Sequence, residues 1–392
     1  MQMPDNTPIY LDHAATTAVR EEVREAMRPY ESERFGNPSS SHRWGRQARG
    51  ALEESRERLA AAIGARRTEI VFTGGGTEAD NLAVLGAWRS HGGPGRWIAC
   101  SAIEHSAVRG AIECAAGEGA GTQTIGVDAE GVVDQGAVDE MLRLPTVLVA
   151  VMWVNNEVGS VQPVERIAAT CAARGVLFHT DAVQAFGRTQ VRVDRVACDT
   201  LALSAHKIGG PKGLGCLFVR SGVELEPLSR GGGQEAGLRP GTQNVAAAVG
   251  FARAAELAVG ELESECARLR ALRDLLEVEL RRHCPNLIVN AAGVERAPHV
   301  VNVSVPNLEP DALVIGLDLE GVAASAGSAC HSGSHEPSHV LTAMGRTVEG
   351  EAAARLSLGH STSEADVRTA AERFGRVVRR LRSTPPLVGV TG

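Results

Sequence analysis

Short apolar runs alternate with helix-forming stretches between residues 69 and 220, and this alternation constrains the fold most strongly. Ala- and Arg-rich stretches with helical spacing, such as Val164–Arg174, separate several of the runs. Strands that alternate with helices predict an α/β fold with a doubly wound, mostly parallel seven-stranded sheet covered on both faces. In such sheets, ligand chemistry is expected at the carboxyl ends of the strands. The predicted strands are Glu69–Thr73, Trp97–Ser101, Thr122–Val127, Val147–Val154, Val176–Thr180, Thr200–Ser204 and Gly215–Arg220.

The region after residue 244 has a different pattern. Residues 244–283 show helical spacing that only Gly250 and Gly260 interrupt, and a helix of this length often links two domains. Four short strands and an Arg-rich amphipathic helix over Glu364–Arg382 follow, which predicts a smaller α+β domain. The four strands are Leu287–Asn290, Val300–Val305, Val322–Ser325 and Arg355–Leu358.

Composition narrows the class of protein further. The chain has 392 residues and a formal net charge of −7, which allows two domains and argues against a nucleic-acid partner held by bulk charge. Residues 1–10 contain no basic region followed by an apolar stretch, and no apolar run is long enough to span a bilayer. Eight cysteines form no C-x-x-C pair, so neither a zinc site nor a thioredoxin-like motif is indicated. We therefore expect a cytoplasmic protein with neither a membrane nor a nucleic-acid partner.

Lysine is nearly absent from the chain. Of the 40 basic residues only Lys207 and Lys212 are lysines, and both lie in the segment 204–213. Arginine cannot replace an amine that must lose its proton and attack a carbonyl, because the guanidinium stays protonated. The segment is therefore a candidate for amine chemistry, and the alternative is chance retention of two surface lysines.

Three groups of residues follow predicted strands and complement one another. The Gly-rich turn 74–78 opens a helical stretch and could bind a phosphate, although such a turn is more often only a turn. Asp181 could hold a pyridine nitrogen protonated, or it could cap a helix. Lys207 follows the strand that ends at Ser204. A phosphate turn, a strand-end carboxylate and a strand-end amine together indicate a pyridoxal 5′-phosphate site.

Cys330 lies in a stretch of small and polar residues, 325–335, unlike the apolar surroundings of several other cysteines. A thiol in such a stretch is a plausible nucleophile. His331, His335 and His339 follow it at a spacing of four, but the intervening Gly and Pro argue against one helix face, so we expect no metal site.

At these residues the chain resembles the NifS/IscS-type cysteine desulfurases, in the class V aminotransferase branch of the fold-type I pyridoxal enzymes. The resemblance covers nearly the whole chain. It implies a large cofactor domain of residues 17–260 and a small domain of residues 1–16 and 261–392. The shared segments are residues 10–17 (YLDHAATT), 35–40 (FGNPSS), 104–105 (EH), 154–159 (VNNEVG), 231–235 (GGGQE) and 355–359 (RLSLG).

The resemblance also implies a role for each matching residue. Lys207 matches the lysine that bonds the cofactor, and Cys330 matches the thiol that forms a persulfide. His105 stacks on the pyridine ring and aids proton transfer, and Arg355 clamps the substrate carboxylate. The other implied positions are Asp181 on the ring nitrogen, Gln184 and Asn156 toward the ring hydroxyl or substrate, Thr77, Ser204, His206 and the Gly76 backbone on the phosphate, and Thr242 on the phosphate of the other subunit of a homodimer.

The implied reaction converts L-cysteine to L-alanine and leaves a persulfide on Cys330, whose sulfur passes to an acceptor such as an iron–sulfur scaffold or a tRNA-thiolation protein. A selenocysteine lyase would share every cofactor residue, and a C–S lyase or aminotransferase would not need Cys330. A degenerate subunit that only docks partners is the non-enzymatic alternative. The chain departs from the family at Ala236, often Arg in relatives, and at His331, often Thr or Ser, which bears on the choice of partner.

Overall fold

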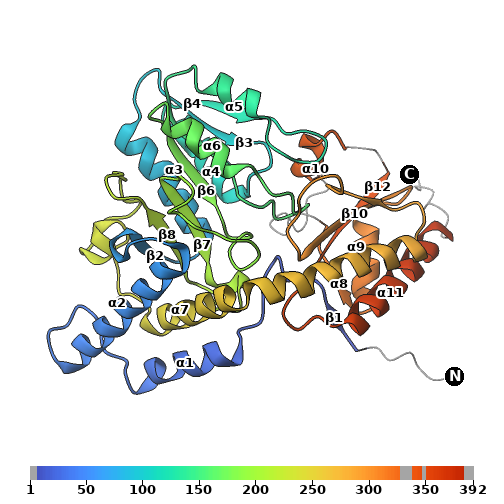
Figure 1. Ribbon diagram of the computed structural model, residues 1–392, viewed down its shortest axis with the longest axis horizontal. Coiled ribbons are helices and arrows are strands. Elements are labelled where there is room, and N and C mark those ends of the chain that lie inside the picture. The colour runs from blue at the N-terminus through green and yellow to red at the C-terminus, as the bar shows by residue number, and fades with distance from the viewer. Residues whose placement is uncertain (1–6, 327–337, 347–349, 384–392) are drawn as a thin grey trace, which may run out of the picture.

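A seven-stranded sheet lies at the centre of the larger part of the molecule (Figure 1). The computed structural model describes residues 7–326, 338–346 and 350–383. The strand order is β2-β8-β7-β6-β5-β3-β4, in which β8 runs antiparallel to both neighbours and the other pairs are parallel, as the alternating pattern predicts. The strands are β2 (Ile70–Thr73), β3 (Trp97–Ser101), β4 (Gly121–Ile125), β5 (Thr146–Ala150), β6 (Leu177–Asp181), β7 (Thr200–Ser204) and β8 (Gly215–Val219).

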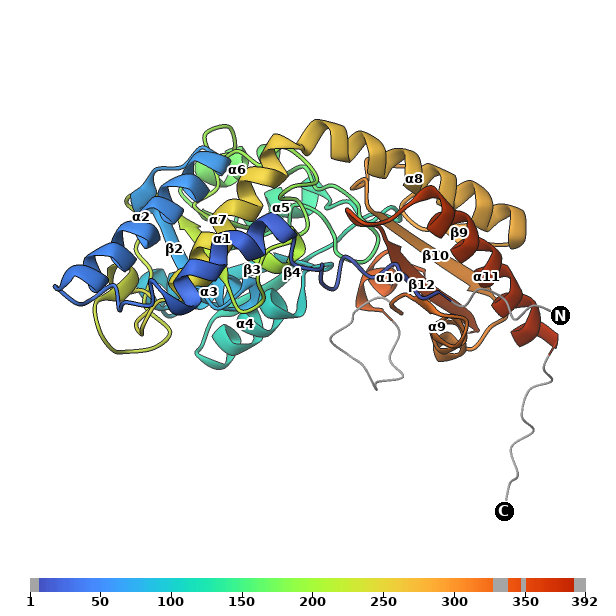
Figure 2. The same cartoon turned by 90° about the horizontal axis from the view of Figure 1, so that it is seen from below.

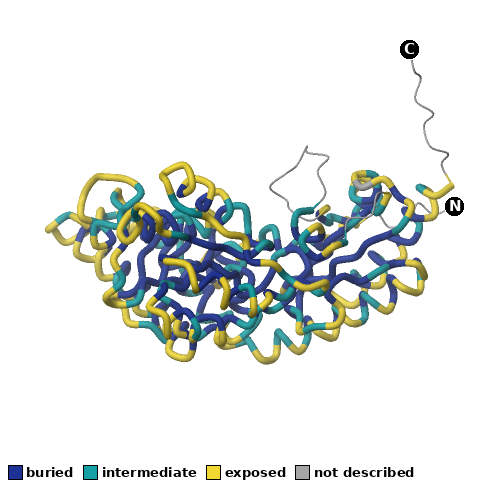
Figure 3. The backbone as a smooth tube through the Cα atoms, turned by 90° about the horizontal axis from the view of Figure 1, so that it is seen from above, coloured by how far each residue is buried: buried dark blue, intermediate teal, exposed yellow. Residues whose placement is uncertain are grey.

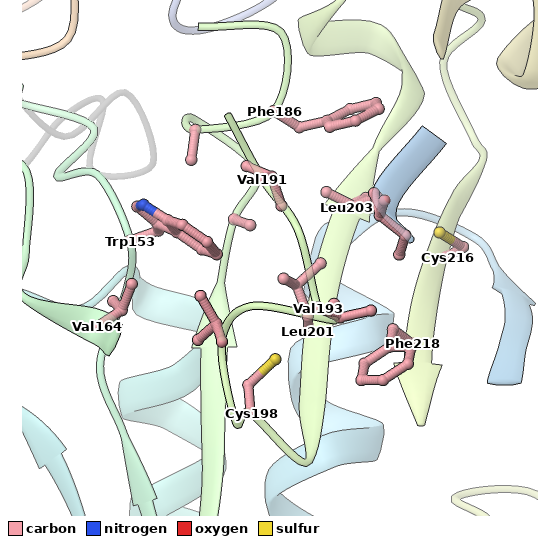
Figure 4. Close-up of a cluster of buried hydrophobic side chains, with 14 of the residues drawn as sticks. Trp153, Val164, Phe186, Val191, Val193, Cys198, Leu201, Leu203, Cys216 and Phe218 are labelled. Carbon is pink, nitrogen blue, oxygen red and sulfur yellow. The ribbon is translucent and has the colours of Figure 1, made fainter. Parts of the chain in front are cut away.

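Successive residues of a strand point to opposite faces of the sheet, and here they are apolar on both faces. Helices therefore cover both faces. In β5, Leu148 and Ala150 belong to the core under α3 (Gly76–His91) and α4 (Ser106–Gly117), while Val149 belongs to the core on the opposite face. Figure 4 shows part of this second core, where Trp153, Leu201 and Phe218 gather. The helices that contribute to it are α1 (Glu21–Ser32), α2 (Arg43–Ile63), α5 (Gln135–Met141), α6 (Val164–Ala172) and α7 (Val245–Gly260).

The smaller unit, at the right of Figure 1, has a separate hydrophobic core around an antiparallel sheet with the order β12-β10-β9. Figure 2 shows α8 and α11 running beside this sheet, and Figure 3 shows its strands as the buried part of this unit. The strand β1 pairs in parallel with β11, so residues 9 and 10 belong to this unit although they come long before it in the chain. The elements are β1 (Ile9–Tyr10), α8 (Leu262–His283), β9 (Ile288–Val289), β10 (Val300–Pro306), α9 (Pro310–Leu319), β11 (Val322–Ala323), α10 (His339–Ala343), β12 (Glu351–Ser357) and α11 (Glu364–Ser383).

Several predicted bounds differ from the structure; β12, for example, begins at Glu351 and not at Arg355, and β11 ends at Ala323 and not at Ser325. The helical stretch 244–283 is two helices, because Glu261 between them has non-helical backbone angles, φ −100° and ψ 1°. The predicted strand 147–154 ends at Ala150. The proposed domain boundaries at residues 16/17 and 260/261 stay a prediction. Within the described ranges, none of the helices combines the length and apolarity needed to cross a membrane.

Candidate active site

The polar residues predicted at strand ends lie along the carboxyl edge of the large sheet. Asp181 is the last residue of β6, Lys207 ends the short 3-10 helix Ala205–Lys207 after β7, and His105 is the N-cap of α4 after β3. Burial raises the pKa of Asp181, while the charges of His105 and Lys207 oppose that rise. The three side chains therefore lie close enough to act on one another's charge.

An open cavity of about 850 Å³ lies at the N-terminus of α3. Gly75 has φ +155° and ψ −177°, a backbone conformation that is essentially restricted to glycine. Ser204 lines this cavity, and its hydroxyl is buried and has no hydrogen-bond partner among the described residues. Backbone N–H groups at the start of a helix attract anions, so this end of the site suits a phosphate. The cavity is lined by Ala15, Thr16, Gly74, Gly75, Gly76, Thr77, Glu78, Asn81, Ser204, His206, Lys212, Gly213 and Leu228.

The amine of Lys207 donates hydrogen bonds to two backbone carbonyls. The distances from Nζ are 2.6 Å to the Ala14 oxygen and 2.8 Å to the Ala15 oxygen. Both carbonyls belong to the segment that follows β1, and Thr17 ties this segment to the large unit by bonding the His206 carbonyl through Oγ1 at 2.7 Å. The N-terminal segment therefore forms one wall beside the lysine.

His105 is held in a defined orientation as a helix cap. Its Nδ1 accepts a hydrogen bond from the Ala107 N–H at 3.2 Å, which leaves the ring proton on Nε2 in the neutral form. Burial lowers the pKa of His105, the charge of Lys207 lowers it further, and Asp181 opposes both. A neutral, fixed imidazole next to Asp181 suits ring stacking and proton transfer.

Arg355 lies at the opposite side of the site, on β12 of the small unit. Its Nη1 donates to the Asn156 carbonyl at 2.9 Å, and its Nη2 donates to Asp12 Oδ1 at 2.8 Å. The side chain is almost fully buried, and Nε has no hydrogen-bond partner in the described part of the chain. A fixed guanidinium with a remaining donor suits a carboxylate ligand.

Gln184 is engaged at both ends of its amide. Its Nε2 donates to the Ala14 carbonyl at 2.9 Å, and its Oε1 is 3.2 Å from Nε2 of His299. Thr242 lies instead in an exposed stretch beside a separate cavity of about 180 Å³, which it lines with Glu235 and Gln243. Cys330, His331 and His335 lie outside the described residues. His339 is described, and its Nε2 is 3.0 Å from the Glu104 carbonyl oxygen.

Sequence reasoning assigned no site role to Asp12, His299 or the carbonyls of Ala14 and Ala15. Asp12 stands in a recognisable segment, but nothing in the sequence indicates its ion pair with Arg355, a residue far along the chain. Lys212, which shares the segment 204–213 with Lys207, lines the cavity at the start of α3. Its position next to a Pro and between glycines gives no signal of that role. Among the described residues there is no cluster of three or more His, Cys, Asp or Glu side chains placed to bind a metal.

Fold and site together define an α/β protein with a candidate site at the carboxyl edge of a mostly parallel sheet, to which Arg355 of the small unit contributes. A sequence profile of the Aminotransferase class-V family matches residues 9–369. The chain therefore belongs to this family.

Relatives with assigned names agree with this placement. The "Cysteine desulfurase IscS" of Dictyoglomus turgidum is 41% identical over 379 residues, 96% of each chain. The "Putative cysteine desulfurase IscS 1" of Bacillus subtilis is 43% identical over 375 residues, 95% of this chain and 99% of the relative. A solved structure described as "NIFS-LIKE PROTEIN" superimposes with a TM-score of 0.89 at 33% identity and covers 96% of this chain and all of the other. Another, "SspA in complex with cysteine", has a TM-score of 0.78 at 36% identity and covers 89% and 98% of the two chains.

Proposed function

We propose that this protein is a cysteine desulfurase that uses pyridoxal 5′-phosphate to convert L-cysteine to L-alanine. The observation that carries the proposal is the meeting of Lys207, Asp181 and His105 at one sheet edge beside a phosphate-type cavity. Relatives named cysteine desulfurase match this chain over nearly its full length, and one similar structure is described as a complex with cysteine.

The residues present fit the cofactor. The unpartnered Ser204 hydroxyl, the N-terminus of α3 with Gly76 and Thr77, and His206 would hold its phosphate, and Lys212 adds a positive charge. Asp181 would hold the ring nitrogen protonated, His105 would stack on the ring, and Lys207 would bond the aldehyde. The bound cofactor would withdraw electrons from the bonds around the substrate Cα.

The chain's own residues would carry the remaining steps. Arg355, fixed by Asp12 and the Asn156 carbonyl, would bind the substrate carboxylate and so orient the Cα–H bond toward Lys207. Lys207 would take the α-proton at Nζ, next to the carbonyls of Ala14 and Ala15. Gln184 and Asn156 would complete the polar wall toward the ring hydroxyl or the substrate. Thr242 would reach the phosphate of the other subunit in a homodimer.

Cys330 would supply the thiolate that attacks the substrate sulfur. The sulfur moves from carbon to the thiol, so cysteine and a thiol yield alanine and a persulfide with all atoms balanced. Other cysteines are poorly suited to this role, because burial raises the pKa of Cys100, Cys171, Cys198 and Cys216 to about 12. Cys114, which is exposed on α4, is the natural control.

The wider setting belongs to the same proposal. We assign residues 17–260 to the cofactor domain and residues 1–16 and 261–392 to the small domain with the Cys330 segment. A sulfur-acceptor protein, either an iron–sulfur scaffold or a thiolation protein, would receive the persulfide sulfur. A cytoplasmic location fits, because a persulfide-forming thiol needs reducing surroundings.

The test is alanine release from cysteine by the purified protein supplied with cofactor and a thiol reductant. Wild type should form alanine and sulfide in equal amounts, and Lys207→Ala should form neither. Faster turnover of selenocysteine that persists in Cys330→Ser would indicate a selenocysteine lyase. Pyruvate and ammonia in place of alanine would indicate a simple C–S lyase, and either result would overturn the proposal.

A further inference from the structure

The carbonyl of Ala14 accepts hydrogen bonds from two side chains of the site. Lys207 Nζ donates to it at 2.6 Å and Gln184 Nε2 at 2.9 Å. Ala14 is itself buried, and its N–H donates to Ser357 Oγ at 2.8 Å. Hydrogen bonds at both the N–H and the carbonyl therefore fix the position of Ala14. Because a carbonyl oxygen can only accept, it stabilises a protonated amine beside it more than a neutral one.

His299 fixes the amide that reaches this carbonyl. Gln184 must point its NH₂ toward Ala14, so its Oε1 is the acceptor that faces His299. The proton of neutral His299 is therefore on Nε2, and the buried Nδ1 has no partner among the described residues. His299 and Gln184 are both buried, with 2% and 6% of their surface exposed, so water competes little for these bonds.

The charges around His299 keep it in this state. Burial lowers its pKa well below the ordinary value, and Arg188, Arg355, His13 and Lys207 lower it further. A neutral histidine that donates one hydrogen bond does not change its role across the physiological pH range. The charge of Lys207 acts on the pKa of four titratable groups around it, which are Asp181, His105, His206 and His299.

We propose that His299 is a positioning residue that, through Gln184 and the Ala14 carbonyl, provides a fixed site for the Lys207 amine whenever it is released from the cofactor. This inference rests on the proposed function, in which Lys207 must leave the cofactor, take a proton and return it. At the carbonyl pair the protonated amine is held within reach of the site. His299 contacts Gln184, and Gln184 shares the Ala14 carbonyl with Lys207, so the effect of His299 is transmitted through Gln184.

The near-absence of lysine gives this proposal a direct test. Lysine carrying ¹³C at Cε would produce two signals in the full-length, cofactor-stripped protein, and Lys212→Arg assigns them. His299→Phe removes the donor while keeping an aromatic ring, and it should lower the pKa of Lys207 by roughly half a unit or more. His299→Gln can still donate to Gln184 and should restore most of the wild-type value. Near-UV circular dichroism and thermal unfolding show whether each variant keeps the fold.

The loaded enzyme provides a second readout. His299→Phe should lower kcat for cysteine about tenfold and leave KM nearly unchanged, because a misplaced amine slows proton transfer without weakening the carboxylate clamp. If His299→Phe does not fold, Gln184→Leu breaks the same link. The Lys207 pKa should then be lower in Gln184→Leu than in wild type. An unchanged Lys207 pKa in the folded variant would overturn the inference. If wild type does not turn over cysteine but His299→Phe still lowers the Lys207 pKa, the positioning role stands and the desulfurase proposal is refuted.

Discussion

Arg355 Nη2 donates a hydrogen bond to Asp12 Oδ1 at 2.8 Å, although 343 positions separate the two residues in the chain. The arginine is 2% exposed and the aspartate 20%, so this ion pair is largely shielded from water. It joins the segment after β1 to the strand β12. A carboxylate ligand would meet a guanidinium whose direction is already set, which lowers the cost of orienting it on binding.

Loss of this guanidinium should weaken substrate binding. Arg355→Ala should raise KM for cysteine about 10- to 150-fold, because a charge-assisted pair of this kind contributes roughly 1.5–3 kcal/mol. Steady-state kinetics with cysteine measure this. Arg220→Ala is the matched control, since Arg220 also bonds backbone carbonyls, those of Cys198, Val193 and Val196, but away from the site. A KM that rises equally in both variants would mean that Arg355 acts only on the fold.

The two lysines should have separable effects on the cofactor. Lys207→Ala should abolish the visible absorbance of the covalently bound cofactor. Lys212→Ala should keep that absorbance but weaken cofactor binding by up to about fivefold, since an exposed charge contributes at most roughly 1 kcal/mol. Lys212→Arg keeps the charge and should bind as wild type. Equilibrium dialysis and spectra decide, and retained absorbance in Lys207→Ala would refute the assignment.

Glu104 should give stability an unusual pH dependence. Burial raises its pKa to about 8, and Asp181 adds to the rise, while bonds from Ser101 Oγ and the Met152 N–H oppose it. The folded protein therefore holds a proton that the unfolded chain loses near pH 4.5, so this contribution to stability falls as pH rises toward 8. Urea unfolding of wild type and Glu104→Gln between pH 5 and 9 should show wild type losing stability relative to the variant. Parallel curves, as expected for the exposed control Glu140→Gln, would contradict this.

The turn at Glu235 and Ala236 stores strain that glycine should relieve. Ala236 is exposed and has φ +57°, a left-handed conformation that costs a non-glycine residue about 1–2 kcal/mol. Ala236→Gly should therefore raise the melting temperature slightly, after the entropy cost of glycine is deducted. Ala169→Gly, at an exposed position inside α6, should lower it by the usual helix penalty. A lower melting temperature for Ala236→Gly would show that the turn is unstrained.

Glu235 itself should be far less tolerant. Its carboxylate is fully buried, bonds Arg56 through both oxygens at 2.5 and 2.8 Å, and accepts from the Phe72 N–H at 2.8 Å. Glu235→Gln removes the buried counter-charge of Arg56 and leaves only the more exposed Glu53 beside the guanidinium, which costs roughly 3–5 kcal/mol. Chemical denaturation measures this cost. Glu53→Gln, which removes a more exposed partner of Arg56, is the control and should cost less than about 1 kcal/mol.

The fold was predictable where the sequence pattern is local. The strands at 97–101 and 200–204 have the predicted bounds, because each is a short apolar run between turn residues. The break at Glu261 was not predicted, although Gly260 precedes it, because a single Gly within a helical stretch is tolerated and the change of direction depends on which core each helix meets. The pairing of β1 with β11 was also missed, because a strand of two residues has no periodicity to detect.

The residues of the candidate site also separate into those that the sequence locates and those that it does not. Asp181, Lys207 and the Gly-rich turn could be located because strand ends of a parallel sheet meet at one edge. Asp12, His299 and the Ala14 carbonyl could not, because their roles arise from contacts between distant segments and, for Ala14, from the backbone alone. The link from His299 to Lys207 passes through four segments of chain, so no local sequence pattern indicates it.

The central claim is that sulfur leaves cysteine by transfer to Cys330. Intact-protein and peptide mass spectrometry after brief exposure of the cofactor-loaded protein to cysteine tests it most directly. Wild type and Cys114→Ser should each gain one sulfur atom on the peptide that contains Cys330. Cys330→Ser should gain none and should lose nearly all alanine formation, since a hydroxyl is a poor nucleophile toward sulfur without an activating base. Added sulfur on another cysteine, or alanine formed by Cys330→Ser at the wild-type rate, would contradict the account.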